Sequence, residues 1–156
     1  MAGEAFMSEA IHLSLENMEK NAWGPFGCVI VKDGKIVGRG WNQVTSTNDP
    51  TAHAEMVAIR DACKHLNSFQ LDGCDIYTSC EPCPMCLWAI YRARPRQIYY
   101  ANTAKDAADI WFDDAFIYKE LDKKFTERKI PMTQLLHNEA LLVFQKWAEK
   151  MDKVEY

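Results

Sequence analysis

The chain has 156 residues, of which 48% are hydrophobic and 26% are charged. This balance is typical of a single globular domain over residues 1–156, and it excludes disordered, collagen-like and membrane-spanning chains. Because 18 basic residues face 22 acidic ones, giving a net charge of −4, we expect a small ligand and no nucleic-acid or membrane partner.

Hydrophobic spacing predicts the secondary structure. In the first helix we expect one side made of Met7, Ile11, Ser14 or Leu15, and Met18, and Asp33-Gly34 between two apolar runs is typical of a hairpin turn. The expected elements are a helix over 4–20, strands over 26–31 and 35–41, a helix starting near His53, a strand over 74–79, a helix ending near Arg94, a strand over 97–101 and a helix over 138–151.

Strands and helices alternate through the middle of the chain. This order predicts an α/β fold, a three-layer α/β/α sandwich with a mixed sheet of about five strands. The start of the chain, residues 1–4, lacks the features of a secretion signal. We therefore expect a cytoplasmic protein whose six cysteines stay reduced and free for packing or metal binding.

Two short motifs stand at the starts of predicted helices. Cys83 and Cys86 are three residues apart, so both sulfurs lie on nearly the same side of a first helical turn. His53 can add an imidazole nitrogen, giving three ligands and leaving one position of a tetrahedral Zn²⁺ site open. An open site is the arrangement in which zinc lowers the pKa of a coordinated water toward ~7.

Glu55 indicates how such a site would work. On a regular helix His53 and Glu55 would face nearly opposite sides, so the ion is expected off the helix end, with Glu55 near the water as a proton shuttle. The alternative is a structural zinc knuckle that adds Cys80 as a fourth ligand, or a zinc-stabilised binding module without turnover. A closed site would leave Glu55 unexplained.

The motifs H-x-E and P-C-x-x-C resemble those of the zinc-dependent cytidine/deoxycytidylate deaminase superfamily. Within it, the chain is most similar to the bacterial guanine deaminases, over almost its whole length. The segments that carry this resemblance are Gly24-Pro25-Phe26-Gly27, the run from Asn48 to Glu55, the run from Thr78 to Cys86, Phe112-Asp113-Asp114 and the C-terminal Tyr156.

The resemblance implies hydrolytic deamination of guanine to xanthine and ammonia, with Zn²⁺ as the cofactor. It assigns the site residues as follows: His53, Cys83 and Cys86 bind zinc, Glu55 moves protons, Asp114 reads or helps protonate the exocyclic amine, and Phe26, Asn42, Ala54 and Tyr156 contact the purine. A carboxylate suits guanine because N1–H and the 2-amino group are both donors. The resemblance also implies a homodimer with an exchanged C-terminal segment.

Some residues leave alternatives open. Without the resemblance, Asn42 would be interpreted as a turn residue and Phe26 as core packing. Arg92 stands where the family carries an aromatic residue, with Trp88 one turn earlier, so Arg92 is either a surface residue or binds a group absent from guanine. Guanosine, cytosine or an aminated triazine are alternative substrates. A tRNA adenosine deaminase is a further alternative, which the acidic charge disfavours.

Overall fold

The computed structural model describes residues 2–21 and 24–154, which form two compact units, 1–114 and 115–156. The elements are α1 (Ala2–Glu19), β1 (Gly27–Lys32), β2 (Lys35–Trp41), α2 (Val44–Thr47), α3 (Ala54–Leu66), β3 (Cys74–Cys80), α4 (Pro84–Ala93), β4 (Gln97–Asn102), α5 (Ala104–Asp109), α6 (Ala115–Leu121), the 3₁₀ turn η1 (Phe125–Glu127) and α7 (His137–Glu149). No helix in the described ranges is long and apolar enough to cross a membrane. The single domain stays a prediction.

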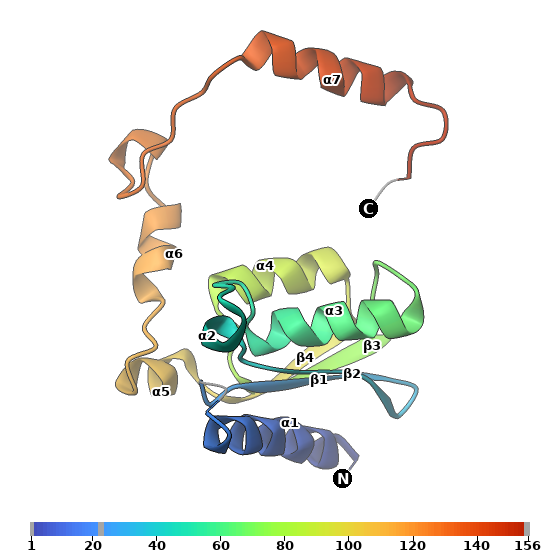
Figure 1. Cartoon of the computed structure of the whole chain (residues 1–156), viewed down its shortest axis with the longest axis vertical. Helices are drawn as coiled ribbons and strands as arrows, with labels where there is room; N and C mark the ends of the chain where they lie inside the picture. Colours follow the sequence, from blue (N-terminus) through green and yellow to red (C-terminus); the bar gives the residue numbers. More distant parts are fainter. Residues whose placement is uncertain (1, 22–23, 155–156) are drawn as a thin grey trace. The chain divides into compact units, whose positions relative to one another are not determined.

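The first unit is the predicted three-layer arrangement. Its sheet has the strand order β2-β1-β3-β4, in which β1 runs antiparallel to β2 and β3, and β3 runs parallel to β4. In Figure 1, α1 covers one face of the sheet, and α3 and α4 cover the other. The mixed sheet is therefore confirmed, but it has four strands among the described residues instead of about five. The chain after β4 is mainly helical, so β4 is left as an edge strand.

Alternating side chains of the strands build two cores. Ile30 and Ile76 pack with Ala58 of α3, whereas Val29 and Tyr77 pack with α1 on the opposite face. Every residue of β3 is buried. β3 is therefore the most protected of the described strands, whereas α3, which carries Glu55 in its first turn, packs mainly on β2 and β1.

The predicted apolar side of α1 is correct only in part: Met7 packs against the core and Ser14 is buried. Ile11, Leu15 and Met18 are 46%, 49% and 42% exposed. Ala10 and Leu13 are buried instead, because the helix backbone lies directly against β1. A Cβ atom placed on Gly27 would stand 2.1 Å from the carbonyl oxygen of Ala10. A contact this close leaves no room for a side chain at position 27, so Gly27 allows the backbone of α1 at Ala10 to pack directly on β1.

A second close contact fixes the start of α3. A Cβ atom on Gly40 of β2 would lie 2.1 Å from the Ala54 oxygen and 2.5 Å from the Ala58 nitrogen. Neither neighbour is a flexible side chain that could move aside. Gly40 therefore sets how closely the first turn of α3, with His53 and Glu55, approaches the sheet.

We expect Gly40→Ala to lower the free energy of unfolding by roughly 1–3 kcal/mol, because the added methyl must push α3 away from β2. Gly3→Ala is the matched control, since its nearest neighbour would be 3.6 Å away and alanine is favoured in a helix. Urea unfolding of both variants checks this. Equal midpoints for Gly40→Ala and the unsubstituted protein would contradict the tight contact.

Candidate metal centre and catalytic cavity

The three predicted ligands come from the starts of two helices. His53 is the N-cap residue of α3 and Cys83 is the N-cap residue of α4, both with extended backbone. Pro84 opens α4, where its missing N–H costs nothing, and the buried Cys86 follows in the same turn. Two helix N-termini therefore lie beside the ligands, and their partial positive charge favours thiolates.

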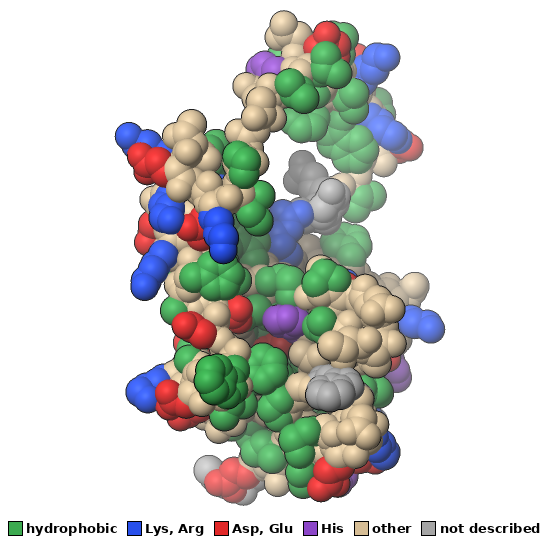
Figure 2. Space-filling model, turned by 60° about the vertical axis from the view of Figure 1, so that its left-hand side comes forward, with side chains coloured by type: hydrophobic (Ala, Val, Ile, Leu, Met, Phe, Trp, Pro, Cys, Tyr) green, Lys and Arg blue, Asp and Glu red, His purple; other side chains and the backbone are tan. Residues whose placement is uncertain are grey.

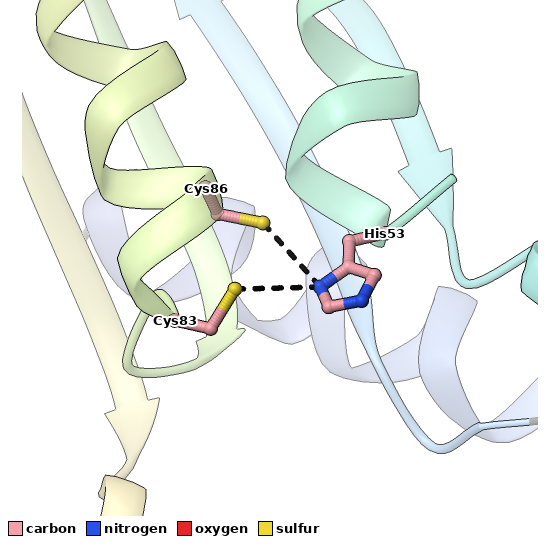
Figure 3. A group of neighbouring side chains, drawn as sticks. All are labelled: His53, Cys83 and Cys86. Atoms are coloured by element: carbon pink, nitrogen blue, oxygen red, sulfur yellow. Dashed lines mark hydrogen bonds between the residues drawn. The ribbon is translucent and has the colours of Figure 1, made fainter. Parts of the chain in front are cut away.

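The ligand atoms point toward one another (Figure 3). The Nδ1 atom of His53 lies 3.5 Å from the Sγ atom of Cys83 and 3.5 Å from that of Cys86. With zinc bonds of about 2.0–2.1 Å to nitrogen and 2.3 Å to sulfur, tetrahedral ligation places nitrogen and sulfur about 3.5 Å apart. The arrangement therefore fits Zn²⁺ with little rearrangement.

The site offers three protein ligands. Within the described part of the chain, the His, Cys, Asp and Glu side chains whose ligand atoms gather to within 4.8 Å of one another are His53, Cys83 and Cys86. Cys80 does not join this group, and its thiol donates to the Thr103 carbonyl at 3.6 Å. The structure therefore favours the open site over the four-ligand knuckle, and a fourth position is left for solvent.

The surroundings of the two thiols shift their pKa values in opposite directions. Cys86 donates a hydrogen bond to the Cys83 sulfur, and this bond, together with that from His53, lowers the pKa of Cys83 to about 4. The same bond and burial raise the pKa of Cys86. The bond to Cys83 also raises the pKa of His53. A lowered pKa at Cys83 suits a residue that binds zinc as a thiolate.

Glu55 lies in the first turn of α3, is only 7% exposed, and lines the cavity described below. Its Oε1 atom accepts a hydrogen bond of 3.2 Å from the Thr78 hydroxyl. Burial raises the pKa of the Glu55 carboxyl above its usual value. A carboxyl of raised pKa beside the ligands, and outside the ligand group, is suited to accept and return protons.

A cavity of about 330 Å³ opens beside the metal ligands. It is lined by Gly24, Phe26, Asn42, Val44, Thr45, His53, Ala54, Glu55, Cys80, Glu81, Cys83, Ala107, Phe112 and Asp114. The lining thus brings together two of the predicted ligands, His53 and Cys83, the predicted proton shuttle Glu55, and Asp114, which was predicted to read or help protonate the exocyclic amine. Three of the predicted purine contacts also line it: Phe26, Asn42 and Ala54. Their roles stay predictions.

Asn42 lies at the end of β2 and is nearly buried. Its Oδ1 atom accepts a hydrogen bond of 3.2 Å from the backbone N–H of Val44. Asn42 therefore stabilises a turn after β2, as the interpretation without the family resemblance predicts. Gly24, at φ +91°, lies so close that a Cβ atom there would be 2.8 Å from the Asn42 Cγ atom. With its oxygen engaged, Asn42 has its NH₂ group left to donate to a ligand.

Two aromatic rings and a carboxylate form another part of the lining. The rings of Phe26 and Phe112 meet edge to face, with centroids 5.0 Å apart and an interplanar angle of 90°. Asp114 follows two residues later, and partial burial raises the pKa of its carboxyl, with a further contribution from Cys83. Phe112 was part of the family-like segment but was not predicted as a site residue.

Glu81 is a lining residue that sequence reasoning missed. Its Oε2 atom accepts a 2.9 Å hydrogen bond from the N–H of Ala104, and its own N–H donates to Asn102 at 2.8 Å. Glu81 therefore ties the loop before Cys83 to the first turn of α5. The sequence could have indicated Glu81 as a cavity residue, because it lies two residues before the ligand Cys83. Nothing in the sequence around Val44 and Thr45, which stand in a polar loop, indicates that they line the cavity.

Trp88 and Arg92, which the sequence also singled out, are not among the described residues that line the cavity. Trp88 and Arg92 lie exposed on α4, Trp88 at 67%. This position does not support the idea that Arg92 holds part of a substrate in this cavity. Tyr156 lies outside the described residues.

Comparisons with known proteins agree with this geometry. The family model for the cytidine and deoxycytidylate deaminase zinc-binding region matches residues 2–102. Guanine deaminase of Bacillus subtilis (strain 168) is 54% identical over 156 residues, covering all of both chains. A tRNA-specific adenosine deaminase of Aquifex aeolicus (strain VF5) is 40% identical over 105 residues, 67% of this chain and 69% of that protein. The X-ray structure of the Bacillus subtilis guanine deaminase matches with a TM-score of 0.95, at 55% identity and 98% coverage of each chain.

We expect the purified protein to contain about one zinc ion per chain, and Cys83→Ser or Cys86→Ser to lose most of it, because each removes one of three ligands. Cys63→Ser is the matched control, since Cys63 belongs to α3, packs against the core and is not in the ligand group. Elemental analysis by mass spectrometry measures the content. Full zinc in Cys83→Ser, or no zinc in the unsubstituted protein, would contradict the assignment.

Proposed function

The chain belongs to the family of zinc-binding cytidine and deoxycytidylate deaminases, and we propose that it hydrolyses guanine to xanthine and ammonia. The observation that carries this proposal is the buried carboxyl of Glu55 beside three ligand atoms at zinc-binding separations, with His53, Glu55 and Cys83 lining one cavity. The full-length similarity to guanine deaminase supports the substrate. The tRNA-specific relative matches only about two thirds of the chain, and a net charge of −4 suits a small base better than a polyanion.

His53, Cys83 and Cys86 would hold the zinc ion, which when bound makes water acidic enough to act as a nucleophile near neutral pH. Glu55 takes the first proton as oxygen bonds to C2 of guanine, and passes it to N3. The second proton, from the hydroxyl now on C2, goes to the departing amine. One water is consumed, and its two hydrogens end on N3 of xanthine and in ammonia.

The polar cavity residues offer hydrogen-bond donors and acceptors that complement those of guanine. Asp114 supplies an acceptor for N1–H and the 2-amino group, and Asn42 supplies an NH₂ donor for an acceptor on the purine edge. Phe26 would lie against the ring face, with Ala54 as a further contact, and Tyr156 would close the pocket. Adenine and cytosine would leave part of this set unpaired, at a cost of ~1–3 kcal/mol for each buried group.

The second unit supports a homodimer. None of residues 115–154 is buried, and α7 exposes Leu141, Phe144 and Trp147 by 40%, 73% and 48%. Figure 2 shows hydrophobic side chains over much of the visible surface. A 13-residue helix is marginal alone, and a soluble chain rarely leaves so many apolar groups uncovered. A second copy that receives the C-terminal segment would cover them.

A cytoplasmic location is also part of the proposal. All six cysteines are free thiols in the structure, and two of them must remain reduced to bind metal. Thiols persist in the reducing cytoplasm and are oxidised in most secreted proteins.

Guanine should be the fastest substrate in a panel with guanosine, adenine, adenosine, cytosine and an aminated triazine, because Asp114 and Asn42 match its edge. Ammonia release at equal substrate concentration measures the rates. Faster turnover of another compound would overturn the choice of substrate and leave the reaction type standing.

Glu55→Gln should lower kcat by ~10²–10⁴-fold while zinc content stays near one per chain, because the amide keeps the shape and loses proton transfer. Steady-state kinetics with parallel metal analysis checks both values. Undiminished turnover with bound zinc would show that another group moves the protons.

The purified protein should have twice the 17.9 kDa mass of one chain. Replacing both Leu141 and Phe144 with Glu should shift it toward single chains, because charge is costly in an apolar contact. Light scattering coupled to size exclusion measures the mass. A stable single-chain mass for the unsubstituted protein at micromolar concentration would refute the dimer.

A further inference from the structure

Thr78 is a polar residue in an otherwise apolar row. It lies in β3, is 1% exposed, and shares a face of the strand with Cys74 and Ile76, which belong to the core under α3 and α4. A buried hydroxyl costs free energy unless it forms a hydrogen bond. Its bond is the 3.2 Å contact to the Oε1 atom of Glu55. If packing were the only requirement at this position of β3, valine, which has the shape of threonine without the hydroxyl, would serve equally well.

The position of the hydroxyl is fixed by the sheet. Thr78 pairs with Cys28 of β1 on one side and with Tyr100 of β4 on the other, so its backbone is held from both sides. Its branched side chain is also restricted at χ1. By contrast, Glu55 is a long side chain in the first turn of a helix. The rigid partner in this hydrogen bond is therefore Thr78.

The carboxyl of Glu55 also accepts a hydrogen bond from its own backbone N–H, and the other side chains near it are weaker partners than Thr78. The thiols of Cys28 and Cys86 lie close enough to Glu55 to affect their pKa values, but thiols are weak donors. Cys86 also gives up its proton when it binds a metal ion. Among the described side chains, the Thr78 hydroxyl is then the strong donor that remains for Glu55.

We propose that Thr78 is a positioning residue that holds Oε1 of Glu55 and thereby fixes the orientation of the carboxyl that exchanges protons in the cavity. This inference rests on the proposed deaminase function, and it goes beyond it by assigning a role to a strand residue that is absent from the cavity lining. Fixing one oxygen keeps the carboxylate from rotating between proton acceptance and proton return, so its effect is expected on turnover and not on substrate binding.

The test compares Thr78→Val, which keeps the shape and removes the hydroxyl, with Thr78→Ser, which keeps the hydroxyl. We expect Thr78→Val to lower kcat by about 10-fold or more, as for loss of a hydrogen bond to a charged group, with KM changed by less than about 2-fold. Zinc content and the urea midpoint should stay near those of the unsubstituted protein. Thr78→Ser should restore most of the lost turnover.

A double variant separates positioning from a general structural effect. In the Glu55→Gln background, Thr78→Val should cause no further loss, because the group it positions no longer transfers protons. Three results would each overturn the role of Thr78. Thr78→Val could lower kcat by the same factor with Glu55 and with Gln at position 55, Thr78→Ser could lower kcat as much as Thr78→Val does, or Thr78→Val could keep the full kcat. If the unsubstituted protein releases no ammonia from guanine, the proposed function and this role fall together, whereas the other outcomes leave the function intact.

Discussion

The site depends on one constraint: the N-termini of α3 and α4 start side by side on the same face of the sheet. This placement brings an imidazole nitrogen within 3.5 Å of two sulfurs that are 30 and 33 residues away in sequence. Gly40 allows α3 to approach the sheet closely, and Pro84 starts α4 directly after Cys83. Because the partial positive charges of both helix ends lie here, thiolates are tolerated in a largely buried place.

The buried position of Glu55 gives the centre its chemistry. A carboxyl exposed on a helix would stay ionised at neutral pH and would return a proton poorly, whereas burial raises the pKa of Glu55 toward the range in which it can do both. The cavity beside it carries apolar rings, Phe26 and Phe112, which exclude water, and few polar groups, which orient a ligand. The residues predicted to bind metal, move protons and recognise the ligand are therefore brought together by the packing around one face of the sheet.

Sequence predicted the local parts of this arrangement well. The starts of both motif-bearing helices followed from spacing and from proline, and the ligand set followed from residue types that few other sites require. The sequence did not predict features that depend on tertiary contact. Ala10 faces the sheet in place of Ile11 because the helix lies against Gly27. The spacing of apolar residues along the helix cannot predict this contact, which depends on a residue of another element. Glu81 lines the cavity because β3 and α5 meet there, and a fifth strand is absent from the described residues because the chain after β4 turns helical.

X-ray absorption spectroscopy of the zinc in the purified protein tests this account most directly, because it counts sulfur neighbours without depending on a substrate. The account predicts two sulfur atoms at about 2.3 Å and two nitrogen or oxygen atoms at about 2.0–2.1 Å, one of the latter from solvent. Three sulfur neighbours would mean that Cys80 closes the coordination shell. That result would contradict an open, hydrolytic site.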